Sequence, residues 1–235
     1  MGTQNTNCTM KFIDIPEDRQ REAINTVALQ TGLPPSSIEK DWWVTQVLKA
    51  LHTLPYAEHI AFKGGTSLSK CWNLIARFSE DVDIALSKAP FAEKPFEVNA
   101  VIPERTFLEK IFLLHEEFRK NEVRVERMSR HIYDLAMMMD SENKIADRAI
   151  HNEALYKAVL EHRRKFIGLK GFNYDELYPA TLCIVPNEDI ARLWHEDYKF
   201  MCEHMIFGQV PSFEELISKL STLNGRIRQL NYRKA

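Results

Sequence analysis

The chain has 235 residues, of which 45% are hydrophobic and 27% charged, proportions that are ordinary for a globular protein with a buried core. Its 31 basic and 33 acidic residues give a formal net charge of −2, which excludes a globally basic nucleic-acid-binding protein, so any RNA contact needs a local patch. Two basic stretches are candidates, residues 162–165 and residues 226–234. Taken alone, each is more simply a solvated helix face or a frayed tail.

Cysteine spacing and hydropathy predict a cytoplasmic protein with no membrane association. Cys8, Cys71, Cys183 and Cys202 are far apart and form no Cys-x-x-Cys pair, so we expect free thiols in a reducing compartment. Residues 1–19 lack the apolar run of a signal peptide. The apolar stretches, such as residues 111–114, are too short to span a bilayer.

The first hundred residues are predicted to mix helices with short strands. Proline and glycine signals bracket a first helix at residues 17–31. A capping-box pattern, Ser36-x-x-Glu39, opens a second helix that ends near Pro55. The elements expected next are a strand at 59–63, a helix at 67–75, a strand at 81–86 and a proline-containing loop at 87–99.

The remainder of the chain is predicted to be helical. Apolar residues recur with helical spacing in five segments, 106–120, 130–139, 150–166, 188–207 and 213–230. We therefore predict an α+β fold, in which a small mixed sheet with flanking helices is followed by an all-helical C-terminal part. The expected domains are residues 1–100 and residues 101–235.

Two features beside the predicted strands at 59–63 and 81–86 could bind a metal-bound nucleotide. Gly-Gly-Thr-Ser at residues 64–67 leads into a helix, and such a turn presents free N–H groups and a helix N-terminus to an anion. Asp81 and Asp83 alternate on the next predicted strand, so their carboxylates point to one face. Mg²⁺ is usually bound by one or two carboxylates plus substrate phosphates.

Each feature also has a plainer interpretation. The glycines alone would be an ordinary turn in which Ser or Thr caps the helix. Two aspartates on one strand face are harder to explain structurally, because Asp has a low strand propensity and like charges repel. The chain contains no His-Glu-x-x-His, Gly-x-Ser-x-Gly or Walker lysine motif, which argues against a zinc protease, a serine hydrolase and a P-loop ATPase.

The glycine turn, the helix and the Asp-x-Asp strand, in this order, resemble the first motif of the DNA polymerase β-type nucleotidyltransferase superfamily. Other segments narrow the resemblance to the AbiEii-like nucleotidyltransferase toxins of prokaryotic abortive-infection and toxin–antitoxin systems. These segments are Glu-Lys-Asp-Trp-Trp-Val at 39–44, Phe-Ser-Glu-Asp-Val-Asp at 78–83, Pro-Glu-Arg-Thr-Phe-Leu-Glu-Lys at 103–110 and Arg-His-Ile-Tyr-Asp-Leu at 130–135. The resemblance runs from about Ile38 to the C-terminus.

This resemblance implies an enzyme that uses Mg²⁺ or Mn²⁺ to transfer a nucleotide from a nucleoside triphosphate to an acceptor hydroxyl. The preferred acceptor is RNA, in particular the 3′ end of tRNA, and a protein hydroxyl is the other candidate. A cognate antitoxin is the expected partner. The implied catalytic residues are Asp81, Asp83, Lys110 and Asp134, of which the first two also bind the metal. The implied nucleotide-binding residues are Gly64, Gly65, Thr66, Ser67, Lys70 and Arg77.

Three of these assignments have structural alternatives. Lys110 lies on a predicted helix, where a lysine is usually a surface residue, whereas the family motif makes it a phosphate-neutralising charge. Asp134 has apolar neighbours and should be paired if buried, so a salt bridge to Arg130 competes with a catalytic role. Arg77 could face a phosphate or the solvent.

The resemblance also implies a third carboxylate, on a strand that follows Asp83. Family members have a long segment there, whereas only residues 87–102 separate the two motifs in this chain. These residues are too few for two or three further strands, and their acids, Glu93 and Glu97, fall in no convincing strand. The alternative function is therefore a catalytically impaired relative that binds a nucleotide or a partner. A metal-dependent phosphohydrolase is a weaker alternative.

Overall fold

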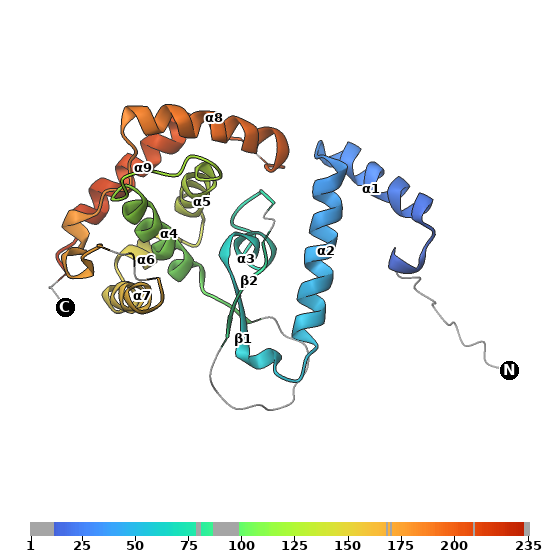
Figure 1. The fold of residues 1–235 in the computed structure, drawn as a ribbon, viewed down its shortest axis with the longest axis horizontal. Helices are drawn as coiled ribbons and strands as arrows, with labels where there is room; N and C mark the ends of the chain where they lie inside the picture. The colour runs from blue at the N-terminus through green and yellow to red at the C-terminus, as the bar shows by residue number, and fades with distance from the viewer. Residues whose placement is uncertain are drawn as a thin grey trace.

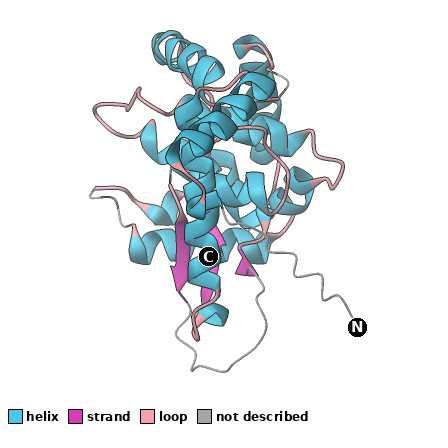
Figure 2. Cartoon of the chain, turned by 90° about the vertical axis from the view of Figure 1, so that its right-hand side faces the viewer, coloured by secondary structure: helices cyan, strands magenta, loops and turns pink. Residues whose placement is uncertain are grey.

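The computed structural model describes residues 12–78, 81–86, 99–167, 169, 171–208 and 210–232. A small sheet lies between the helices of the C-terminal part and the long helix α2 (Pro35–His52), as Figure 1 shows. Its three strands are β1 (Ile60–Lys63), β2 (Asp83–Leu86) and β3 (Asn99–Ala100), in the order β2-β1-β3. Strand β1 pairs antiparallel with β2 and parallel with β3. The view turned by 90° shows the strands together near one end of the molecule (Figure 2). The α+β prediction is confirmed.

Two helices precede the sheet. Helix α1 (Glu17–Thr31) has the predicted bounds, because Gly32 ends it in the left-handed conformation at φ 73°. Helix α2 (Pro35–His52) begins earlier than predicted, with Pro34 at the cap position and no side-chain cap. The capping-box prediction is therefore wrong, since proline at the first helical position sets the start instead. Val44 and Leu48 of α2 form a small core with Phe62 of β1.

Helix α3 (Gly64–Lys70) starts directly after β1 and is shorter than the predicted helix at 67–75. The glycine turn is itself the first turn of this helix. Beyond Lys70 the chain leaves the helix, and Asn73 adopts a positive φ of 48°. Strand β2 starts at Asp83, so Asp81 lies just ahead of the strand and not within it.

The loop predicted at 87–99 falls mainly on residues 87–98, which lie outside the described residues. Asn99 at its end belongs to β3, opposite Ala61. This two-residue strand is too short to have a periodic pattern of its own.

The C-terminal part is helical, as predicted. Its helices are α4 (Pro103–Glu117), α5 (Ser129–Met139), α6 (Ile145–Ile150), α7 (Glu153–Phe166), α8 (Glu188–His204) and α9 (Phe213–Arg228). Short 3₁₀ turns occur at Phe12–Asp14, Ala57–His59, Tyr174–Glu176 and Pro179–Thr181. The predicted helix at 150–166 is divided, because Asn152 caps α7 by accepting a hydrogen bond from Leu155 N at 2.9 Å.

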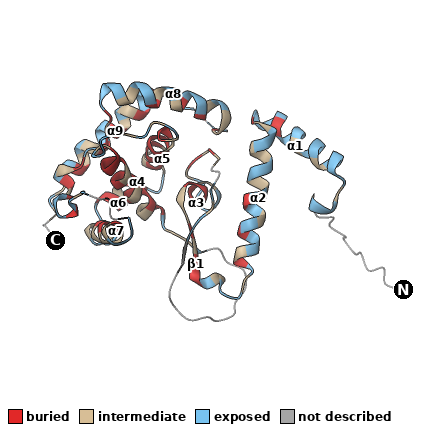
Figure 3. Ribbon diagram, viewed as in Figure 1, coloured by how far each residue is buried: buried red, intermediate tan, exposed pale blue. Residues whose placement is uncertain are grey.

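Helix α5 lies at the centre of this part. It contacts α4, α6, α8 and α9, and Ile132, Tyr133 and Leu135 are fully buried. Figure 3 shows buried residues concentrated on α4 and α5. Each such apolar side chain stabilises the fold by roughly 1.5–3 kcal/mol.

A short backbone bridge joins the two parts. Phe78 N donates to Met205 O at 2.9 Å and Phe207 N donates to Ala76 O at 3.0 Å, which pairs Arg77 with Ile206 in antiparallel fashion. Leu68 and Ile75 join the helical core. The cavity described in the next subsection lies where these parts meet, and the domain boundary near residue 100 stays a prediction.

Two further predictions concern the described residues. Cys71, Cys183 and Cys202 are free thiols, as their spacing predicted, while Cys8 lies outside the described residues. None of the described helices combines the length and the apolarity needed to cross a bilayer.

Candidate active site

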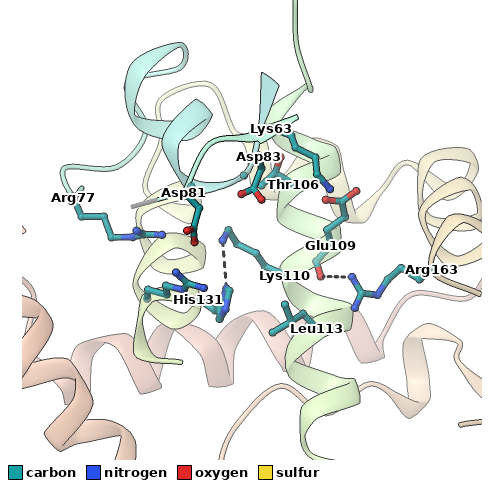
Figure 4. Close-up of a pocket in the computed structure, with 13 residues that line it drawn as sticks. Lys63, Arg77, Asp81, Asp83, Thr106, Glu109, Lys110, Leu113, His131 and Arg163 are labelled. Atoms are coloured by element: carbon teal, nitrogen blue, oxygen red, sulfur yellow. Dashed lines mark hydrogen bonds between the residues drawn. The ribbon is translucent and has the colours of Figure 1, made fainter. Parts of the chain in front are cut away.

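A polar cavity of about 230 Å³ lies between the β1–α3 turn, the start of β2, and helices α4, α5 and α7. It brings together six of the predicted site residues, Gly64, Gly65, Arg77, Asp81, Asp83 and Lys110. Charged side chains from several elements point toward it (Figure 4). Its lining includes the cations Lys63, Arg77, Lys110, Arg130 and Arg163 and the carboxylates Asp81, Asp83 and Glu109.

The two glycines allow charged side chains to approach the backbone closely. Gly64 has a φ of +77°, and a Cβ there would lie 2.1 Å from Asp83 Oδ2. A Cβ at Gly65 would lie 2.7 Å from Arg77 Nη2. Both distances are far below contact distance, so any side chain at either position would displace a charged group of the cavity. The Gly-Gly pair thus places the carboxylate of Asp83 and the guanidinium of Arg77.

Asp81 and Asp83 are both exposed and both line the cavity. Among the described residues neither forms an ion pair. Thr66 Oγ1 donates to the backbone carbonyl of Asp81 at 2.7 Å, which holds the segment ahead of β2 against α3. Two carboxylates directed at one cavity repel each other, and a bound divalent cation would relieve this repulsion.

The donor set fits a hard divalent cation bound with its substrate. The described residues contain no group of three or more potential ligands arranged around one point. Two aspartates plus the phosphate oxygens of a nucleotide are nonetheless the common way in which proteins bind Mg²⁺. Asp81 and Asp83 are the residues that would hold it.

Behind the cavity, Asp134 forms a buried ion triad with Arg77 and Lys110. Arg77 binds it in bidentate fashion, with Nε–Oδ1 at 2.7 Å and Nη2–Oδ2 at 2.6 Å, and Lys110 Nζ lies 2.8 Å from Oδ2. The side-chain exposures are 2% for Arg77, 0% for Asp134 and 9% for Lys110. The structural alternative, a salt bridge from Asp134 to Arg130, does not form; the catalytic role of Asp134 stays a prediction. Arg77 is buried and ion-paired, so it does not face the solvent. It also lines the cavity, and its contact with a phosphate stays a prediction.

Burial and charge act in opposite directions within this triad. Burial raises the pKa of Asp134, but Arg77 and Lys110 outweigh burial and hold that pKa well below its ordinary value. Burial lowers the pKa of Lys110, and Asp134 partly offsets this. Asp134 is absent from the cavity lining, so in the described structure its carboxylate fixes the two cations that do line it.

Three predicted nucleotide-binding residues lie outside the cavity lining. Thr66 and Ser67 are buried, and Ser67 Oγ donates to Gly64 O at 3.0 Å. The Ser67 hydroxyl therefore holds the turn together, and the Thr66 hydroxyl ties it to the segment ahead of β2. Lys70 Nζ lies 2.8 Å from Asp41 Oδ1 of α2. Their roles in nucleotide binding stay predictions.

Helix α4 supplies cavity residues that were not predicted. Thr106, Glu109 and Leu113 line it together with Lys110. The positions 106, 109, 110 and 113 share one helix face, so the spacing from Lys110 was a signal that could have identified them. Thr106 is only 3% exposed and its Oγ1 has no partner in the described part of the chain, which leaves a hydroxyl available to a ligand.

Arg163 also lines the cavity, although it belongs to the basic stretch at 162–165. It is buried, with Nε 2.7 Å from Glu116 Oε1 and Nη1 3.5 Å from Glu109 O, the latter drawn in Figure 4. A basic stretch thus contributes an interior cation, which charge counting could not show. His131 Nδ1 lies 3.5 Å from Lys110 Nζ, and burial together with Lys110 lowers the pKa of His131 well below its ordinary value.

Comparison with known proteins identifies the family. Neither the curated proteins nor the solved structures provide a match. A family model described as nucleotidyl transferase AbiEii toxin, type IV toxin–antitoxin system, matches residues 46–94 and 86–219. This family implies nucleotidyltransferase activity on a nucleoside triphosphate and an antitoxin as partner. The matched segments contain the glycine turn, both aspartates, Lys110 and Asp134, and they cover well over half of the sequence, so the chain belongs to the AbiEii nucleotidyl transferase toxin family.

Proposed function

We propose that this protein transfers a nucleotide from a nucleoside triphosphate to the 3′ hydroxyl of RNA, with tRNA as the preferred acceptor and Mg²⁺ or Mn²⁺ as cofactor. It would act in the cytoplasm as the toxin of a toxin–antitoxin or abortive-infection pair. One observation carries the proposal. Asp81 and Asp83, which have no ion-pair partner among the described residues, share a cavity with the glycine turn and with several cations.

The charges of the cavity suit a metal–triphosphate complex. A divalent cation offsets the two aspartates, and the phosphate oxygens then face the positive side chains of the lining. For Lys63 and Arg130 the described residues provide no ion-pair partner, so their charges remain available to phosphate. Lys110 adds a charge held in place by Asp134 at 2.8 Å. Fixed cations aimed at developing negative charge are the main source of catalysis in phosphoryl transfer.

The reaction is an in-line displacement. The acceptor oxygen forms a bond to the α-phosphorus, the bond from the α-phosphorus to its bridging oxygen breaks, and pyrophosphate leaves. The hydroxyl proton passes to a cavity carboxylate and then to water. A bound divalent cation would supply Lewis-acid polarisation of the phosphoryl group. The chain itself positions the triphosphate with Lys63 and Lys110 and neutralises the charge that develops on the leaving group.

Glu109 offers a third acid, from helix α4 and not from a strand. Besides Asp81 and Asp83, Glu109 is the carboxylate found among the described residues that line the cavity. Glu93 and Glu97 lie outside the described residues. Glu109 Oε1 accepts a hydrogen bond from Arg105 Nε at 3.1 Å, and the action of Glu109 as a third acid is part of this proposal. The competing proposal, a nucleotide-binding relative without turnover, rests on the short segment after Asp83 and needs the same experiment.

The test uses purified protein, total tRNA, Mg²⁺ and each of the four α-labelled nucleoside triphosphates in turn. We expect labelled RNA and stoichiometric pyrophosphate with the wild type, and at least about 100-fold less with Asp83→Asn. The matched control is Asp189→Asn, because Asp189 is also an exposed aspartate and lies on α8 outside the cavity lining.

The other outcomes decide between the alternatives. Failure to label RNA with all four nucleotides contradicts the RNA-transfer proposal. Calorimetric affinity for triphosphate that survives alanine at Asp81 and Asp83, with no pyrophosphate, favours the impaired relative. Release of inorganic phosphate without a labelled acceptor favours a phosphohydrolase.

A further inference from the structure

A second cavity adjoins the active site. It has a volume of about 410 Å³ and lies between the segment that leads into α5 and the C-terminal half of α8. Arg130 lines both cavities, so the two are neighbours across a single side chain. No predicted site residue belongs to the second cavity, and of its lining residues only Arg130 takes part in the nucleotide transfer proposed above.

The side chain of Arg130 links the two cavities. Its Nε is buried and has no hydrogen-bond partner among the described residues. Arg130 also lies close enough to Asp81 for that carboxylate to raise the pKa of the guanidinium, against the stronger lowering effects of burial and of Arg77. A buried guanidinium nitrogen without an acceptor is costly, and a ligand that spans both cavities would supply one.

An exposed aromatic ring forms part of the opposite wall. Phe200 is 61% exposed, and its ring stacks on that of His204 with centroids 4.2 Å apart and planes at 19°. Met201 and Met205 line the same wall. The platform is therefore flat, apolar and supported from one side, which suits a planar ring system.

The polar end of the second cavity is already satisfied internally. Asp197 accepts hydrogen bonds from Arg127 N at 2.6 Å and from Ser129 N at 2.9 Å. This carboxylate occupies the N-terminus of α5 and leaves no anion site there. Recognition in this cavity must therefore come from the aromatic platform and from Arg130, a combination typical of single-stranded nucleic-acid binding. An extended peptide would instead be expected to use a sheet edge or a helix-binding groove.

We propose that the second cavity is the acceptor subsite, in which the 3′-terminal base of a single-stranded RNA end stacks on Phe200 while Arg130 binds the adjoining phosphate and directs the 3′ hydroxyl toward Asp81 and Asp83. This inference rests on the proposed function, because it assigns the acceptor side of the same reaction. The volume of the second cavity, about 410 Å³, lies within the range of ordinary ligand sites.

The test measures RNA binding without catalysis. The probe is a fluorescent single-stranded oligoribonucleotide with a free 3′ hydroxyl, and its Kd is obtained from anisotropy for wild type, Phe200→Ala, Phe200→Trp and Phe166→Ala. Base–aromatic stacking of ~1–3 kcal/mol corresponds to about 5- to 150-fold in affinity. We expect Phe200→Ala to weaken binding by this factor and Phe200→Trp to retain it. Phe166→Ala, at a phenylalanine of α7 that is 74% exposed, should bind like wild type.

Two further readouts separate this inference from the proposed function. Triphosphate affinity, measured by calorimetry, should be unchanged in Phe200→Ala, and an oligonucleotide whose 3′ end is paired in a duplex should bind more weakly than the single strand. If the wild type labels RNA but Phe200→Ala binds and labels it equally well, the subsite is refuted while the proposed function stands. If the wild type labels a protein and no RNA, both the subsite and the RNA acceptor are refuted.

Discussion

Replacing Asp134 with asparagine removes the negative charge from a buried triad and leaves two cations facing each other. Arg77 and Lys110 are 2% and 9% exposed, and both contact the same carboxylate within 2.8 Å. Breaking a buried ion pair by removing one partner costs ~3–5 kcal/mol. At ~2–4 °C per kcal/mol for a chain of this size, the melting temperature of Asp134→Asn should fall by about 6–20 °C.

The assay is urea unfolding followed by far-UV circular dichroism at pH 7, with Asp175→Asn as the control. Asp175 pairs with Arg164 on the surface, where its side chain is 79% exposed, and loss of such a pair should cost less than about 1 kcal/mol. An Asp134→Asn variant that loses no more stability than Asp175→Asn would refute the argument that the triad is a buried charge cluster.

The pH dependence of the unfolding free energy provides a second test of the same triad. The pKa of Asp134 is lower in the folded protein than in the unfolded chain, so its contribution is fully present above the unfolded pKa of ~3.9. As the pH falls below that value, the unfolded chain takes up a proton at Asp134 first, so the contribution declines and is lost once the pH passes the lowered pKa of the folded protein. The difference in unfolding free energy between wild type and Asp134→Asn should therefore shrink under acid conditions, and a difference that grows would contradict this.

Three further predictions concern the metal, the glycine turn and a buried histidine. EDTA should abolish nucleotide transfer and Mg²⁺ or Mn²⁺ should restore it, whereas transfer that persists in EDTA would exclude the two-aspartate metal site. Gly64→Ala should reduce nucleotide transfer about 100-fold by displacing Asp83. The control is Gly171→Ala, at a similar φ of +79° but with no atom within 4 Å of the added Cβ, which should cost only the backbone strain of ~1–2 kcal/mol. Equal activity of the two variants would contradict the close approach of Asp83 to Gly64. Burial lowers the pKa of His115 from 6.5 to about 4, so its neutral form stabilises the fold above pH 6.5 and this contribution is lost as the pH falls to 4. Relative to His115→Gln, the wild type should lose about 3 kcal/mol across that interval, and parallel unfolding curves would show that the histidine does not titrate as inferred.

Local sequence signals predicted the elements that carry the site. The order of strand, glycine turn, helix and second strand was predictable because hydrophobic periodicity and glycine act over a few residues. The exact first and last residues of these elements were less predictable. Helix α3 begins at Gly64 and not at Ser67, because the positive φ of Gly64 turns the chain into the helix at once.

Pairings across long sequence distances were not predictable. Asp134 was matched with Arg130, its neighbour one helical turn away, yet its bidentate partner Arg77 lies 57 residues before it in sequence. Rules for helix neighbours cannot identify such a partner, because tertiary packing brings the two together. The same limit applies to Arg163, whose position in a basic stretch suggested solvent, although it pairs with Glu116 in the interior.

The backbone bridge between residues 76–78 and 205–207 joins segments that are distant in sequence beside the proposed active site. Gly208 packs so tightly there that a Cβ would lie 2.5 Å from that of Ala76, and the bridge directly precedes the segment with Asp81. A polypeptide truncated before α8 would lose the partner strand of Arg77 together with the wall that bears Phe200. We therefore expect a chain that ends before residue 205 to transfer no nucleotide, because the segment that carries Asp81 is anchored through residues 205–207.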